Sequence, residues 1–201
     1  MYSIVEYDEC LICHDSILVG LSLFALITND QICRKCRSDL KINIKMTKFH
    51  GHQLITLYKY ELGRKLLIRY KDYLDTALSP IFLSPFNILS NFIFKGYSLV
   101  LIPSSESMRK RRGFDHLDLM LQAIRLKQFK ILAKDDSLQR FSKDRQVKFR
   151  LLNDQPLKKV IIFDDVITSG NSIKAALDLL VPISDSIIII CLFNNLSEVR
   201  E

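Results

Sequence analysis

The stretch from Val160 to Ser172 constrains the fold more than any other part of this 201-residue chain. Four apolar residues, Val160–Phe163, form a run that suits a strand buried on both faces, as in a parallel sheet. Asp164 and Asp165 follow directly, and a loop of small residues leads into Ile173–Leu180, which has helical spacing. The pattern predicts a strand, an acidic pair, a tight loop and a helix, and therefore an α/β fold.

The acidic pair and the loop predict a ligand that carries two kinds of group. Ligands of open α/β sheets bind at the carboxyl ends of the strands, where Asp164 and Asp165 would lie. The loop before the helix offers free backbone N–H groups to an anion, most naturally a phosphate. The two carboxylates do not bind that phosphate, so they require vicinal sugar hydroxyls or a divalent cation. A solvated acidic turn after a buried strand is the alternative without a function.

The run Val160–Gly170 resembles the phosphoribosyl-pyrophosphate (PRPP) signature of type I phosphoribosyltransferases. That signature reads apolar strand, two acids, apolar, any residue, Thr/Ser, Thr/Ser, Gly. The resemblance implies a Rossmann-like, mostly parallel sheet, with Asp164 and Asp165 holding the ribose 2′ and 3′ hydroxyls. The 5′-phosphate would lie in a loop made of Thr168, Ser169, Gly170, Asn171 and Ser172.

Four of the five cysteines form two Cys-x2-Cys pairs, Cys10 with Cys13 and Cys33 with Cys36, nineteen residues apart. A two-residue gap lets both thiolates of a pair face one ion, and two pairs complete a tetrahedral zinc site without an open position. We expect a structural zinc module at residues 1–50 and a phosphoribosyltransferase-like domain at residues 51–201. Disulfides are the alternative, but the acidic start of the chain is not a signal peptide, and nothing else suggests secretion.

A second turn and a basic run are candidates for binding the leaving group. Tyr97–Ile102 is expected to be a buried strand, and the resemblance places a pyrophosphate-binding turn after it, at Ser104 and Ser105. Four consecutive cations follow at 109–112, and because like charges repel, this run favours an anionic partner. The residues assigned to pyrophosphate, anion or DNA contact here are Arg109, Arg111 and Arg112. A nonspecific basic patch is the alternative.

The run Arg111–Leu117, Arg-Arg-Gly-Phe-Asp-His-Leu, narrows the resemblance to the ComF family, whose members commonly show Arg-Gly-Phe-Asn-Gln there. Asp115 and His116 replace the two amides. The segment 138–145 resembles the flexible hood that such proteins carry over the bound ligand. It would bring Lys143 and Arg145 to the leaving pyrophosphate and exclude water when it closes.

The ComF resemblance implies a function in natural transformation. The chain would bind PRPP with Mg²⁺ and handle single-stranded DNA in the cytoplasm, with competence proteins such as a DNA-uptake helicase as candidate partners. The segment Ser107–Val160 carries 15 Lys/Arg and 6 Asp/Glu, a net +9 in a chain of +7, which suits an acidic partner. The alternative is an active phosphoribosyltransferase of nucleotide metabolism or salvage, without a DNA role, whose acceptor the sequence does not identify.

The remaining segments continue the alternation of strands and helices. Strands are expected at Leu54–Tyr60, Phe129–Ala133 and Ser186–Phe193, and helices at Glu61–Leu78 and Leu117–Leu126. Thr76–Phe94 is uncharged over nineteen residues, near the length of a membrane span. Because it contains two prolines and several polar residues, a packed helix pair is the better interpretation, and no membrane span is expected. Lys71, on the basic side of the first helix, is a lesser candidate for a phosphate contact.

Overall fold

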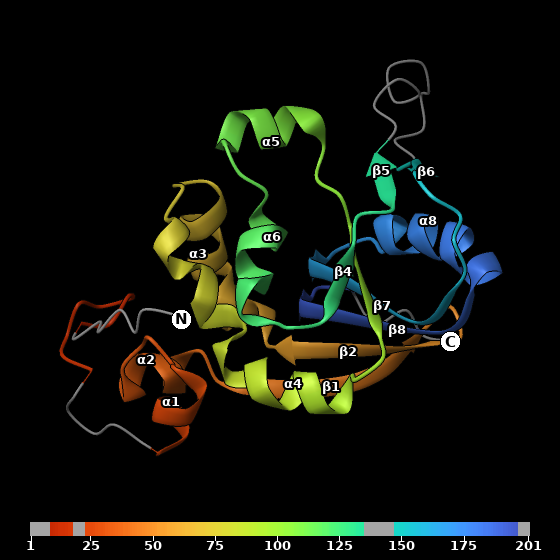
Figure 1. Ribbon diagram of the computed structural model, residues 1–201. Coiled ribbons are helices and arrows are strands. Elements are labelled where there is room, and N and C mark those ends of the chain that lie inside the picture. The colour runs from red at the N-terminus through yellow and green to blue at the C-terminus, as the bar shows by residue number, and fades with distance from the viewer. Residues whose placement is uncertain (1–8, 18–22, 135–146, 197–201) are drawn as a thin grey trace.

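A six-stranded sheet forms the centre of the molecule (Figure 1). The computed structural model describes residues 9–17, 23–134 and 147–196. The strand order is β1-β2-β8-β7-β3-β4, and β1 is antiparallel to β2 while the other neighbours are parallel. The α/β architecture with a mostly parallel sheet, predicted from the sequence, is confirmed.

The sheet strands, in spatial order, are β1 (Ile42–Phe49), β2 (His52–Tyr58), β8 (Ser184–Asn194), β7 (Leu157–Ile167), β3 (Ser98–Leu101) and β4 (Lys127–Phe129). A separate antiparallel pair consists of β5 (Leu132–Lys134) and β6 (Phe149–Leu151). The described α-helices are α1 (Leu23–Thr28), α2 (Arg34–Asp39), α3 (Tyr60–Lys71), α4 (Asn87–Ile93), α5 (Glu106–Arg112), α6 (His116–Met120) and α8 (Asn171–Leu180). Short 3₁₀ segments are η1 (Thr76–Phe82), η2 (Ser84–Phe86), η3 (Leu121–Ala123) and η4 (Val181–Ile183).

The two faces of the sheet are buried in two hydrophobic clusters. Ile161 and Phe163 of β7 pack into the cluster that holds α3, η1 and α6. Val160 and Ile162, which point to the opposite face, pack with α8. Because both faces are covered, the central strands read as continuous apolar runs, as parallel strands usually do. This explains the buried run in β7 and the five consecutive buried residues at the end of β2.

Close packing between α3 and β8 depends on Gly63. A Cβ atom at Gly63 would overlap the Cε1 and Cζ atoms of Phe193, whose side chain is fully buried. We expect Gly63→Ala to destabilise the protein by about 1–3 kcal/mol, since the fixed ring cannot yield without moving the helix. Urea denaturation measures this loss.

The double variant Gly63→Ala/Phe193→Leu provides the control for this contact. A smaller ring-free side chain makes room for the methyl group, so the double variant should lose less free energy of unfolding than the two single variants together. If the losses in free energy of unfolding are additive, the methyl group at residue 63 does not clash with the Phe193 ring.

The cysteine-bearing segment packs against the sheet domain. Cys10, Cys33 and Cys36 belong to the same buried cluster as Tyr58 and Tyr70. Arg37, paired with Asp30 at 2.5 Å, also donates to the carbonyl of Ile81 at 3.0 Å. The strand β1 lies before the expected boundary at residue 50 yet is hydrogen-bonded to β2, so the sheet begins within the predicted N-terminal module.

Several element boundaries differ from the sequence-based prediction. The helix expected at Glu61–Leu78 ends at Lys71, because Leu74 adopts a left-handed backbone (φ 60°) and the following residues wind as 3₁₀. The strand expected at Phe129–Ala133 divides into β4 and β5. Each half pairs with a different sheet, β4 with β3 and β5 with β6. The helix expected at Leu117–Leu126 begins at His116, ends at Met120 and continues only as the short η3.

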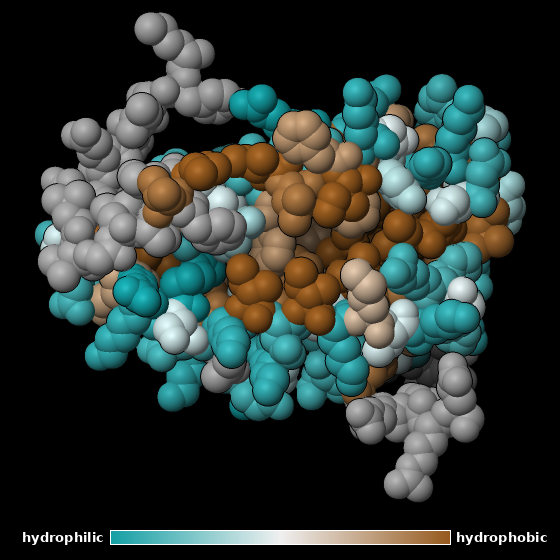
Figure 2. Space-filling view, turned by 90° about the horizontal axis from the view of Figure 1, so that it is seen from below, coloured by the Kyte–Doolittle hydropathy of each residue, from teal (hydrophilic) through white to brown (hydrophobic). Residues whose placement is uncertain are grey.

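The uncharged segment after α3 covers part of one face of the sheet. Among the described residues, Thr76–Ile93 has the length and composition of a membrane span, and a third of it is buried. It consists of η1, η2 and α4 with Pro80 inside η1, so the expected helix pair is replaced by two 3₁₀ turns and one short α-helix. Beside it lies an apolar groove of about 340 Å³, lined by residues that include Met46, Leu89 and Ile93. Figure 2 shows hydrophobic side chains gathered across the middle of this face.

Candidate functional site

The acidic pair lies near the carboxyl end of β7. The strand continues through Asp164 and Asp165 to Ile167, so the two acids belong to the strand and do not follow it. Asp165 is 3% exposed, whereas Asp164 is partly exposed and its Oδ1 accepts a hydrogen bond from the Asp165 backbone N–H at 2.9 Å. Parallel strands lie on both sides of β7, which places the pair at the centre of the sheet edge. This is the position where α/β sheets bind ligands.

Two side chains from other elements, Lys71 and His116, face this pair, and a third, Arg112, acts on Lys71. The Lys71 ammonium, at the end of α3, pairs with Asp165 Oδ2. His116, the first residue of α6, faces Asp165 Oδ1 with its Nε2 at 3.6 Å. Arg112, the last residue of α5, is only 9% exposed in its side chain, and its Nη2 lies 3.7 Å from Asp72 Oδ1. The carboxylates thus lie in a partly buried, charge-compensated site.

Burial shifts the titration of these groups. It raises the pKa of Asp164 to about 7, although the nearby Lys71 ammonium opposes the shift. Burial and the Arg112 guanidinium lower the pKa of Lys71 to about 8, against the attraction of the Asp164 and Asp72 carboxylates. Burial, followed by the charges of Lys71 and Arg112, lowers the pKa of His116 to about 2, so its imidazole is neutral. Burial therefore favours the uncharged forms of all three groups more than water does.

The expected phosphate loop joins β7 to α8. Gly170 adopts a left-handed backbone (φ 74°) at the N-cap of α8, a ten-residue helix, and Thr168, Ser169 and Asn171 are exposed. The Asn171 N–H contacts Ser169 Oγ at 3.4 Å, and Ser172 is partly exposed. A Cβ at Gly170 would lie 2.5 Å from Phe49 Cζ, so β1 packs directly beneath the turn. The loop has the form of an anion-binding turn at a helix N-terminus.

The turn after β3 holds one serine at the acidic pair and one at a helix. Ser104 Oγ lies 3.1 Å from His116 Nδ1, which links the turn to the residue that faces Asp165. Ser105 caps α5 by accepting a hydrogen bond from the Met108 N–H at 3.3 Å. Since the imidazole is neutral, an Nε2–H toward Asp165 leaves Nδ1 to accept from the Ser104 hydroxyl. The structure therefore brings Ser104 into the site and uses Ser105 as a helix cap.

The basic run forms the helix α5, whose cations separate into two groups. Arg112 is buried beside Lys71 and Asp72, whereas Arg109 and Arg111 are exposed. Arg109 lines a pocket of about 370 Å³ between α5, α6 and the β5–β6 pair, and Lys134 and Arg150 line it as well. Lys134, Arg150 and His116 were not among the site residues predicted from the sequence. The sequence feature that could have identified them is a basic or imidazole side chain next to a predicted loop. Lys143 and Arg145 lie outside the described residues.

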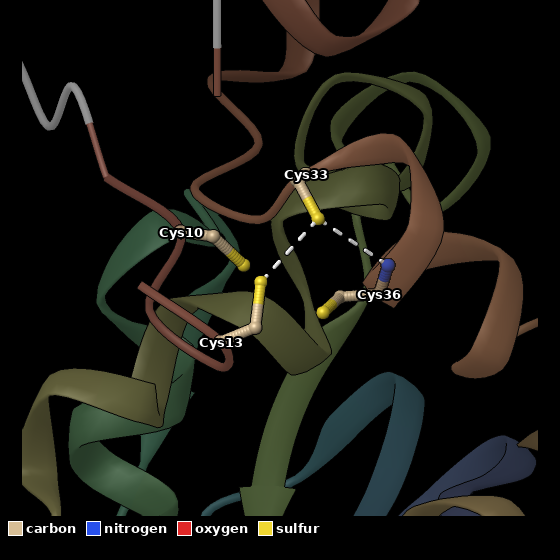
Figure 3. A group of neighbouring side chains, drawn as sticks. All are labelled: Cys10, Cys13, Cys33 and Cys36. Carbon is tan, nitrogen blue, oxygen red and sulfur yellow. Dashed lines mark hydrogen bonds between the residues drawn. The ribbon is translucent and has the colours of Figure 1, made fainter. Parts of the chain in front are cut away.

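The four paired cysteines form one cluster (Figure 3). Their sulfur atoms all lie within 4.8 Å of one another, and Cys13 Sγ and Cys33 Sγ are 3.7 Å apart. In a tetrahedral site with Zn–S bonds of about 2.3 Å, the sulfur atoms lie about 3.8 Å from one another, whereas a disulfide requires about 2.05 Å. All five cysteines are free thiols, and Cys191 is buried in β8, away from the cluster. The cluster could therefore hold a metal such as zinc.

The protein backbone prepares the cluster for a cation. Burial would raise the pKa of the Cys10 thiol, but the backbone N–H groups of Cys13, Cys33 and Ile12 lower it to about 7. Burial, and then the neighbouring cysteines, raise the pKa of Cys36 well above its usual value. Four thiolates therefore do not form together unless a positive ion offsets their charge.

The family models and curated proteins compared with this chain include no relative of it. The chain matches no known family model and no curated protein. The candidate site is therefore defined by the geometry of the chain itself: an acidic pair on a central parallel strand, a glycine turn before α8, and cations from α3 and α5.

Proposed function

We propose that the protein binds PRPP at the carboxyl end of β7 and is a phosphoribosyltransferase-like protein of the ComF type. The observation that carries this proposal is the acidic pair, Asp164 and Asp165, on a central parallel strand that leads through the left-handed Gly170 into the N-terminus of α8. The sequence resemblance and this placement favour the same ligand, a ribose with a 5′-phosphate. The four-cysteine cluster holds a structural zinc ion in the same proposal, since its spacing suits four thiolates and leaves no open position.

Each part of PRPP has a counterpart in the site. The ribose hydroxyls donate to the carboxylates, and backbone N–H groups of the loop at Thr168–Ser172 bind the 5′-phosphate. The pyrophosphate lies toward Ser104 and the cations Lys71 and Arg112, and Mg²⁺ would accompany it. In an active enzyme these cations stabilise the negative charge that develops as pyrophosphate leaves. The acceptor is undefined, so pyrophosphate release in the presence of candidate acceptors is the measure of turnover.

Single-stranded DNA is a second candidate ligand, consistent with a role in natural transformation in the cytoplasm. The observation that favours it is the exposed outer side of α5, which carries Arg109, Lys110 and Arg111. Part of this charge is already compensated, because Lys110 pairs with Glu106 at 2.8 Å and Arg111 lies 3.9 Å from Asp72. Phosphate-dominated binding should weaken steeply between about 50 and 200 mM salt, which fluorescence anisotropy with a labelled oligonucleotide would detect.

Titration calorimetry with PRPP and Mg²⁺ tests the proposed function. We expect measurable heat with the wild-type protein, and affinity lower by about 10–100-fold in Asp164→Asn and in Asp165→Asn, the range for one lost charge-assisted hydrogen bond. The amides keep the size of the carboxyl groups, so the loss reports charge and hydrogen bonding more than packing.

Asp178→Asn is the matched control, since Asp178 is exposed on α8 outside the acidic pair. It should bind PRPP as the wild-type protein does. Equal heats in the wild-type protein and in the double variant Asp164→Ala/Asp165→Ala, or no heat in either, would rule out PRPP binding at this pair.

A further inference from the structure

Both carboxylate oxygens of Asp165 face groups of the protein. Lys71 pairs with Oδ2, and His116 Nε2 faces Oδ1 at 3.6 Å. The side chains of Lys71 and Asp165 are 18% and 5% exposed, so the pair is largely withdrawn from water. Apart from the Lys71 ammonium, Asp165 Oδ2 has no partner among the described residues, so the charge of Lys71 offsets its burial. A ribose hydroxyl that donates to this oxygen competes directly with the ammonium.

A second buried cation lies beside Lys71 with a donor unused. Arg112 is 9% exposed in its side chain, and its Nε is buried without a hydrogen-bond partner in the part of the chain that the structure describes. After burial, the charge of Arg112 contributes to the lowered pKa of Lys71. Two neighbouring cations and an unpartnered donor favour an anionic group of a ligand at this point.

We propose that Lys71 is an internal counter-cation of the site, bound to Asp165 in the free protein and released from it when a ribose diol binds. This inference rests on the proposed function. The diol hydroxyls then donate to Asp165 in place of the ammonium, and Lys71 turns with Arg112 to the pyrophosphate of the ligand. Lys71 and Asp165 each have a partner both before and after the exchange, which limits the free-energy cost of burying their charges. The flexible four-carbon stem of lysine permits such a change of partner.

The exchange makes Lys71 a specificity-determining residue. Ribose 5-phosphate carries the diol and the 5′-phosphate but no pyrophosphate, so its binding breaks the Lys71–Asp165 pair and gives the ammonium no new partner. PRPP supplies that partner. The affinity for ribose 5-phosphate is therefore reduced. The state in which Lys71 has left Asp165 is only a minor one unless a second anionic group stabilises it.

Opposite changes in the affinities for two ligands test this role. Calorimetry with PRPP and with ribose 5-phosphate, each with Mg²⁺, compares wild-type protein with Lys71→Met. We expect PRPP to bind about 10–100-fold more weakly, and ribose 5-phosphate about threefold or more tightly, since its competitor is gone. Lys65→Met on the exposed side of α3 is the control and should change neither affinity. Equal weakening of both ligands would mean that Lys71 only maintains the structure, and would overturn the inference.

A metal titration without any sugar separates this inference from the proposed function. With Lys71 removed, Asp164 and Asp165 present two uncompensated carboxylates, so Lys71→Met should bind Mn²⁺ about tenfold or more tightly than the wild-type protein. Electron paramagnetic resonance measures the free Mn²⁺, and the added change Asp165→Asn should abolish the gain.

If neither sugar binds to the wild-type protein, the proposed function fails, while a gain of Mn²⁺ binding still supports the role of Lys71 as a counter-cation. No gain would overturn it. Lys71→Gln repeats the test if Lys71→Met does not fold.

Discussion

The variant Cys36→Ser is expected to lose its bound zinc and a large part of its stability. Cys36 lies 7% exposed within the same hydrophobic cluster as Tyr58, Tyr70 and Phe82, so the metal site belongs to the core of the molecule. Apparent binding free energies of structural zinc sites are about 10–16 kcal/mol near neutral pH, and that energy contributes to folding. Even a loss of about 5 kcal/mol would lower the melting temperature by roughly 10–20 °C in a chain of this size.

Metal analysis and thermal denaturation measure the two effects together. Protein purified without chelator should carry about one zinc per chain, and Cys36→Ser well under half of that. Cys191→Ala is the matched control: Cys191 is also buried but lies in β8, where its Sγ is 3.6 Å from the Thr56 hydroxyl. It should keep the full zinc content. A wild-type protein with less than about half an equivalent of zinc would contradict the proposed metal.

The variant Gly170→Ala is expected to lose about 2–5 kcal/mol of stability through two separate penalties. The left-handed backbone at φ 74° costs a residue with a Cβ about 1–2 kcal/mol. A Cβ would also approach Phe49 Cζ to 2.5 Å, and such overpacking costs about 1–3 kcal/mol more. If the turn relaxes to relieve the contact, the loop that begins α8 changes shape, so PRPP binding should weaken as well.

Gly51 provides the control that separates the two penalties. It adopts a similar backbone, φ 81°, but a Cβ there would meet no atom within 4 Å. Gly51→Ala should therefore lose only the backbone component, and the difference between the two variants in urea denaturation isolates the contact with Phe49. Equal losses in Gly51→Ala and Gly170→Ala would show that Phe49 does not restrict the turn.

Much of the secondary structure could be predicted where one physical cause dominates. Val160–Phe163 and Ile187–Phe193 are continuous apolar runs, and each lies in a strand buried on both faces. Boundaries failed where tertiary contacts override local pattern. Leu74 ends α3 with a left-handed turn although the apolar spacing continues, and Ile131 turns the chain from β4 to β5 by accepting the Leu152 N–H at 2.8 Å. The strand β1 was missed because most of its residues are exposed, which gives the apolar pattern little contrast.

In the candidate site, too, local sequence patterns predicted some features, whereas others depend on tertiary contacts. Asp164, Asp165 and Gly170 are close together in the sequence, so the local pattern predicts their order along a strand and a turn. Ser104 was predicted to bind pyrophosphate, and in the structure its hydroxyl lies beside His116. That contact joins two elements whose proximity no local pattern shows.

The sequence by itself determined the strand, acidic pair and turn, and the two cysteine pairs, because each depends on spacings of a few residues along the chain. Only the tertiary structure decided that Lys71 and His116 face Asp165 and that Arg112 is buried beside them. The physical reason is that charge compensation depends on distance and burial in space. Lys71 at the end of α3 and His116 at the start of α6 lie against Asp165 and are largely withdrawn from water with it. Burial shifts the pKa values of Asp164 and Lys71 toward each other.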